Sequence, residues 1–180
     1  MTTSASLMLL IGLALAGSRI TLAQIDLAQD LLERSRFKFD SLVAGRTHFV
    51  YLGGGALYGL ANEGALKLME MSLSFSQAYH PLEYRHGPVS LVDERSLVVM
   101  LYQADPLEES KLAHELQCKD ANVIGIGGPG DLSLEIESSD DAIRGLIALP
   151  ILQWLGERVA QSKGLDTRAP RHLTKVVVLT

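Results

Sequence analysis

Short apolar segments alternate along this sequence with longer segments of helical pattern, and this alternation limits the folds that the chain can adopt. Residues 48–52, 96–102 and 121–128 are almost continuously apolar and lack the alternation typical of a strand with one solvated face. Segments with helical periodicity, 56–72 and 105–120, separate them. Parallel strands are joined by such crossovers and are buried on both faces. The pattern therefore predicts an α/β fold, a three-layer sandwich with a mainly parallel sheet.

Two further strands and one long helix complete the predicted sheet domain. Residues 75–80 have the composition of a short strand, and residues 132–138 alternate apolar and polar side chains like an edge strand. Residues 140–164 predict a long helix, with a kink at Pro150 and an end at Gly164.

A helical arm is expected before this domain, so that residues 1–45 form the arm and residues 46–180 the sheet domain. The run LMLLIGLALAG is too short for a transmembrane helix. It could be the core of a signal peptide cleaved near TLAQ, but no lysine or arginine precedes it. We favour two helices that bury an apolar face against the sheet or another subunit, in a cytoplasmic protein without a membrane span.

Composition excludes several classes of protein. The chain is 47% hydrophobic and 21% charged, which is typical of a globular domain rather than a disordered one. Its net charge of -5 and the absence of a basic run argue against a nucleic-acid partner. A single cysteine, Cys118, excludes a disulfide within the chain and any cysteine-rich metal motif. No metal site is expected.

A glycine turn, Gly53–Gly55, stands between the first predicted strand and its helix. The first turn of a helix offers free backbone N–H groups and a positive dipole end, which suit a phosphate. Glycine turns also serve tight packing of a helix against a strand. The sequence leaves both interpretations open for Gly53 and Gly54.

Three charged residues, Glu63, Lys67 and Glu70, fall on one face of the helix that follows. Their i, i+4, i+7 spacing permits weak ion pairs on a solvated face. The surrounding residues are apolar, so the three could equally form a half-buried acid/base cluster.

The segment HPLEYRHGP, residues 80–88, suits neither a regular helix nor a strand. It holds Arg85 and His86 between Pro81 and Pro88. Restricted backbone freedom favours precise placement of a histidine that moves protons, although an isolated loop histidine is more often a surface residue. His80 and His86 lack the spacing of a helical zinc pair.

Three stretches together, YLGGGALYGLANEGALKLMEMS, EYRHGPVSLVD and PRHLTKVVVLT, resemble the sugar isomerase (SIS) domain. More narrowly, they resemble the second of two tandem SIS repeats, as in the isomerase half of glucosamine-6-phosphate synthase. Tagatose-6-phosphate ketose/aldose isomerases and hexosamine-phosphate deaminases or deglycases share this arrangement. The resemblance implies a flavodoxin-like α/β fold, no cofactor, and aldose–ketose interconversion of a hexose or hexosamine 6-phosphate.

The same resemblance implies roles for individual residues. Glu70 matches the base that carries a proton between C1 and C2 of the open-chain sugar. His86 matches a histidine that assists ring opening from a neighbouring subunit. Lys67 and Glu63 match residues of the same active-site helix, and Lys175 matches a lysine that contacts the sugar from the C-terminal tail. A homodimer, or pairing with a first SIS repeat, is therefore expected.

The match has gaps. The family's Ser/Thr-rich phosphate loop, of the form S-x-S-G-x-T, belongs to the first repeat and has no counterpart here. Thr2 and Ser4 resemble the junction that follows that repeat and are expected to border the sugar. No N-terminal catalytic cysteine for glutamine hydrolysis is present. Two alternatives stay open: a non-catalytic phosphosugar-binding module, and a truncated remnant.

Overall fold

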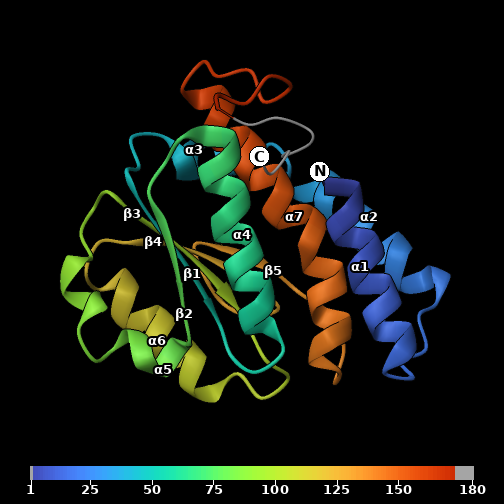
Figure 1. Cartoon of the computed structure of the whole chain (residues 1–180). Coiled ribbons are helices and arrows are strands. Elements are labelled where there is room, and N and C mark those ends of the chain that lie inside the picture. Colours follow the sequence, from blue (N-terminus) through green and yellow to red (C-terminus); the bar gives the residue numbers. More distant parts are fainter. Residues whose placement is uncertain (1, 173–180) are drawn as a thin grey trace, which may run out of the picture.

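The computed structural model describes residues 2–172, with side chains described from residue 5 onwards. Within that range the sheet has five strands in the order β2-β1-β3-β4-β5, and every adjacent pair is parallel (Figure 1). The strands are β1 (His48–Gly53), β2 (Ser76–Tyr79), β3 (Ser96–Leu101), β4 (Asn122–Ile126) and β5 (Leu132–Leu134). The predicted α/β class and parallel sheet are confirmed.

Helices cover both faces of the sheet, which makes the three predicted layers (Figure 1). One face carries α4 (Leu57–Ser72) and α7 (Asp141–Ser162), with α2 (Leu22–Ser35) and α3 (Phe39–Val43) packed against α7. The other face carries α5 (Pro81–Tyr84) and α6 (Leu107–Gln117). The strands separate two hydrophobic cores, one on each side.

Successive side chains of β1 point into two different cores, which explains why the sequence of this strand is continuously apolar. Phe49 and Tyr51 belong to the core beneath α4 and α7, whereas Val50 and Leu52 belong to the core beneath α5 and α6. All four are at most 1% exposed. Successive side chains of a strand point to opposite faces, so a strand covered on both sides needs an apolar residue at every position.

Two predicted boundaries differ from the structure. The edge strand expected over 132–138 stops at Leu134, because the backbone carbonyls of Ile136 and Ser138 accept hydrogen bonds from the Arg144 side chain instead. The helix expected from Asp105 begins at Leu107, with Pro106 at its N-cap position.

The segment 80–88 is more helical than the sequence indicates. Pro81 occupies the first turn of α5, where a missing N–H costs nothing, and Tyr84 is fully buried beneath it. A 3₁₀ helix, η1 (Pro88–Leu91), follows. The expectation of a wholly irregular loop was therefore wrong, and one buried aromatic ring anchors the segment.

The N-terminal arm consists of α1 (Thr2–Leu15) and α2, as predicted, with α3 as an additional short helix. Leu31 of α2 and Phe39 of α3 lie in the core beneath α4 and α7, so the arm shares the core of the sheet domain. Several apolar side chains of the arm remain exposed: Leu7, Met8, Ile11, Leu15, Leu22 and Ile25. None of the helices described is long and apolar enough to cross a membrane.

Candidate active site

The helix α4 presents Glu63, Lys67 and Glu70 as a continuous charged row. The Lys67 Nζ atom lies 2.6 Å from Glu70 Oε2 and 3.9 Å from Glu63 Oε1. The Lys67 side chain is only 7% exposed, and the two carboxylates are 24% and 20% exposed. A solvated row would leave all three side chains in water, so the structure favours the half-buried acid/base cluster.

Burial changes the proton affinity of this row. Desolvation raises the pKa of Glu63, with the positive charge of Lys67 opposing the rise and the negative charge of Glu70 adding to it. Glu63 Oε1 is buried without a hydrogen-bond partner among the described residues. A carboxyl group with a raised pKa can donate or accept a proton closer to neutral pH than an exposed one.

A cavity of about 380 Å³ opens beside this row, between α1, α4 and α7. Its lining is largely apolar apart from two charged side chains, and consists of Ala5, Met8, Leu9, Gly59, Leu60, Glu63, Lys67 and Leu149. Thr2 and Ser4 belong to the first turn of α1, just before the lining residue Ala5. The side chains of these two residues lie outside what the structure describes. Substrate-sized ligands commonly bind in cavities of about this volume.

The glycine turn between β1 and α4 is tightly packed. A Cβ atom added to Gly53 would lie 2.6 Å from the carbonyl oxygen of Leu57, and one added to Gly54 would lie 2.3 Å from Gln103 Oε1. At Gly53 the close atoms belong to the Leu57 backbone, so glycine is required there, whereas at Gly54 they belong to the end of the flexible Gln103 side chain, which can move aside. The structure supports the packing interpretation for Gly53, while Gly54 lines a cavity.

His86 lies on the opposite face of the sheet from Glu70. Its neighbours Tyr84 and Val89 both pack into the core beneath α6, while Glu70 belongs to α4 on the other face. His86 is exposed, and its backbone N–H donates to the carbonyl of Glu83 at 3.1 Å. Neither His86 nor Glu70 lines the cavity beside α4 or the cavity next to the glycine turn. One chain alone does not bring them together. Lys175 lies outside the described residues.

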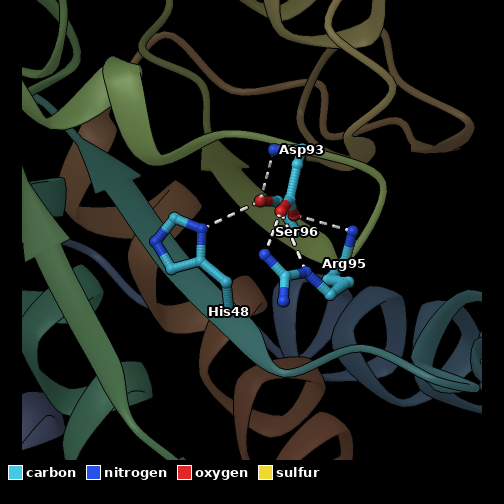
Figure 2. A network of polar contacts seen from close by, with 4 residues as sticks. All are labelled: His48, Asp93, Arg95 and Ser96. Carbon is cyan, nitrogen blue, oxygen red and sulfur yellow. Dashed lines mark hydrogen bonds and ion pairs between the residues drawn. The ribbon is translucent and has the colours of Figure 1, made fainter.

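A polar network that the sequence did not reveal joins the start of β1 to the start of β3 (Figure 2). His48 Nδ1 lies 2.8 Å from Ser96 Oγ, which also accepts from the backbone N–H of Asp93 at 3.1 Å. The Asp93 carboxylate accepts from Arg95 at 2.9 Å, not from His48. Burial lowers the pKa of His48, and the charge of Asp93 opposes this only in part.

This network is not a nucleophilic triad, because the carboxylate pairs with Arg95 rather than orienting the imidazole. It lies at the amino ends of the strands, whereas ligands of parallel sheets bind at the carboxyl ends. His48 and Ser96 are 48 positions apart, so nothing in the local pattern links them. The described residues contain no group of three or more side chains suited to holding a metal ion.

Comparisons with a family model and with curated proteins point to the same protein family. The model of the SIS domain matches residues 42–131. Glutamine–fructose-6-phosphate aminotransferase (isomerizing) of Bacteroides thetaiotaomicron is 34% identical over 142 residues, which are 73% of this chain and 23% of that protein. The enzyme of the same name from Gloeobacter violaceus is 31% identical over 168 residues, 87% of this chain and 27% of that one. The chain thus spans about a quarter of these relatives.

Solved structures agree. Glucosamine-6-phosphate deaminase of Thermotoga maritima has a TM-score of 0.85 and 35% identity, covering 99% of this chain and 57% of that one. Tagatose-6-phosphate ketose/aldose isomerase of Escherichia coli has a TM-score of 0.66 and 25% identity, covering 87% and 46%. With the family model matching half of its length and the same fold in these neighbours, the chain belongs to the SIS domain family.

Proposed function

We propose that this chain is a subunit of a phosphosugar isomerase or deaminase that moves a proton between C1 and C2 of an open-chain hexose or hexosamine 6-phosphate. The observation that carries the proposal is the ion-paired row on α4, with Lys67 Nζ 2.6 Å from Glu70 Oε2 beside a largely apolar cavity. Glu63 and Lys67 line the cavity, and Glu70 does not line it but is ion-paired to Lys67 one helical turn away. A carboxylate held in this way suits proton transfer next to a carbonyl group.

The proposed step needs no redox partner. Glu70 takes the proton from one carbon, the electrons of that C–H bond form the C=C bond of an enediol or enolamine, and the carbonyl oxygen gains a proton. Glu70 then returns the proton to the former carbonyl carbon, and the hydroxyl or amino group on the other carbon loses a proton to solvent as its C=O or C=N bond forms, which completes the isomerisation. Lys67 positions the Glu70 carboxylate, Glu63 binds the sugar, and Lys175 is proposed to reach it from the C-terminal tail.

A second SIS domain completes the site in this proposal, either in another copy of the chain or in a first-repeat partner. The separation of His86 from Glu70 across the sheet supports this, because an incoming chain could supply the histidine. Apolar side chains are exposed on α4 and just after it: Leu66, Met69, Leu73 and Phe75. The chain covers 57% of the deaminase from Thermotoga maritima, which leaves length in that protein for a further domain.

Phosphate is the part of the substrate that this chain is least equipped to bind. The cavity next to the glycine turn is lined by Glu83, Asp105, Glu108 and Glu109, and these carboxylates would repel a phosphate. We therefore propose that the second SIS domain supplies the phosphate site.

Turnover of three sugars tests the proposal: fructose 6-phosphate, glucosamine 6-phosphate and tagatose 6-phosphate. Each is assayed with the chain alone and with a first-repeat SIS protein. Glu70→Gln is expected to lower turnover by ~10²–10⁴-fold, and Glu135→Gln, which removes the same charge from an exposed position, is expected to leave it unchanged. Undiminished turnover in Glu70→Gln would remove Glu70 from the mechanism.

The separation of His86 and Glu70 also favours a second candidate, a phosphosugar-binding module without catalysis. A ligand at 100 times its dissociation constant stabilises a folded protein by about 2.7 kcal/mol. Thermal stabilisation by a phosphosugar, with no turnover in any of the assemblies above, would establish this alternative.

A further inference from the structure

A second cavity, of about 440 Å³, lies at the carboxyl ends of β1 and β3, where the strand order of the sheet reverses direction. Ligands of open α/β sheets bind at such switch points. The lining residues are Gly54, Gly55, His80, Pro81, Leu82, Glu83, Gln103, Asp105, Leu107, Glu108 and Glu109. The cavity does not include the charged row on α4.

Glu109 is the most unusual residue of this lining. It is 6% exposed, yet only one of its carboxylate oxygens is satisfied: Oε2 accepts from the backbone N–H of Gln103 at 3.0 Å. Oε1 is buried and has no hydrogen-bond partner in residues 2–172. A buried acceptor without a donor is costly, typically by about 1–3 kcal/mol. Because Glu109 lines the cavity, a ligand bound there is placed to supply the donor that this carboxylate lacks.

The charges around the cavity disfavour the binding of an anion. Among the described residues that line it, four are acidic and His80 alone can carry a positive charge. Lys111 and Arg85 pair with Glu108 from outside the lining. Two backbone N–H groups that could hold an anion are already used, since Gln103 donates to Glu109 and Ala104 donates to Asp141 at 2.9 Å.

We propose that this cavity binds a small molecule carrying a primary ammonium group, which donates a hydrogen bond to Glu109 Oε1. An ammonium group brings three donors and a positive charge, so it would satisfy the orphaned oxygen and offset the acidic lining. Hydrogen bonds between charged partners are about twice as strong as neutral ones. The site is independent of the isomerase proposal, because none of the α4 charges contributes to it.

Titration of the full chain with three compounds, followed by the NMR shifts of backbone amides, tests the site. Glucosamine carries the ammonium group, N-acetylglucosamine has the same ring without the charge, and inorganic phosphate has the opposite charge. We expect glucosamine alone to shift the amides of Gly54, Gly55 and Gln103 at millimolar concentration. Binding at the α4 cavity would instead shift the amide of Gly59.

Two variants sharpen the test. Glu109→Gln keeps an acceptor for the Gln103 N–H and is expected to weaken glucosamine binding at least about tenfold, the equivalent of ~1.4 kcal/mol. Glu135→Gln, on the exposed surface, should bind like the parent protein. If Glu109→Gln does not fold, Glu83→Gln at the exposed rim of the cavity replaces it, with weaker binding expected. Equal binding of N-acetylglucosamine, no shift at these amides, or unchanged affinity in the folded cavity variant would overturn the proposal.

Discussion

Lys67 Nζ lies between two carboxylates of its own helix, 2.6 Å from Glu70 Oε2 and 3.9 Å from Glu63 Oε1. The lysine is the most buried of the three, so its charge is separated from water and directed at the two acids. One ammonium group therefore determines both the position of the proposed base and the charge of the row.

Lys67→Met removes that ammonium group and leaves two half-buried carboxylates side by side. We expect a loss of about 1–3 kcal/mol in the free energy of unfolding at neutral pH. The loss should shrink as pH falls, because protonation of the unpaired carboxylates relieves their repulsion. Urea denaturation at about pH 7 and about pH 5 measures both effects. Lys119→Met, at an exposed position, is the control. An equal loss at both pH values would contradict the role of Lys67 in charge compensation.

Glu109 should make stability fall as pH rises. Burial, the largest cause, raises its pKa from 4.5 to about 7 in the folded state, while the Gln103 N–H opposes the rise. The folded chain thus holds this proton more tightly than the unfolded chain. The resulting stability is fully present below about pH 4.5 and is lost as pH rises through about 7, by up to about 3 kcal/mol.

Glu109→Gln should remove this pH dependence of stability. The free energy of unfolding of the variant should therefore rise relative to that of the parent between about pH 4.5 and about pH 7. Thermal denaturation across this range, with Glu135→Gln as the matched control, measures it. A constant difference over the window would show that Glu109 keeps an ordinary pKa.

Arg144 connects the ends of three strands through its buried side chain. Its guanidinium group donates to the carbonyls of Tyr102, Gly127, Ile136 and Ser138 over 2.8–3.0 Å. Arg144→Met would leave these acceptors unpaired, with an expected cost of about 3 kcal/mol or more. Chemical denaturation of the variant tests this, with exposed Arg19→Met as the control. An ammonium group cannot reproduce the planar donor geometry of a guanidinium group. Parent-like stability of Arg144→Lys would therefore contradict the importance of these four hydrogen bonds.

Ser96 is fully buried and serves both His48 and Asp93 at the amino end of the sheet. Ser96→Ala deprives the Asp93 N–H of its acceptor and His48 of its partner, so we expect a cost of about 1–3 kcal/mol. Ser90→Ala, at an exposed position of η1, should cost little. Hydrogen exchange of the β1 and β3 amides would locate the effect. Protection unchanged at both strands would mean that the network does not hold them.

Local patterns were sufficient to predict most elements of this fold. Apolar runs marked β1, β3 and β4 close to their true bounds, and helical spacing placed Glu63, Lys67 and Glu70 on one face. Both signals repeat within a few residues, because strand and helix periodicities are properties of the backbone itself. The end of β5 was misplaced because the Arg144 side chain, six to eight positions further along, donates to the backbone carbonyls of Ser138 and Ile136.

Local sequence patterns were enough to predict the α/β class, the parallel sheet and the shared helical face of Glu63, Lys67 and Glu70. Three features became visible only in the folded chain: His86 and Glu70 lie on opposite faces of the sheet, the Gln103 side chain packs against Gly54, and one Glu109 oxygen is buried without a partner. Each of them involves different elements of the fold. They depend on which face of the sheet each crossover covers and on how side chains pack there, which no local periodicity encodes.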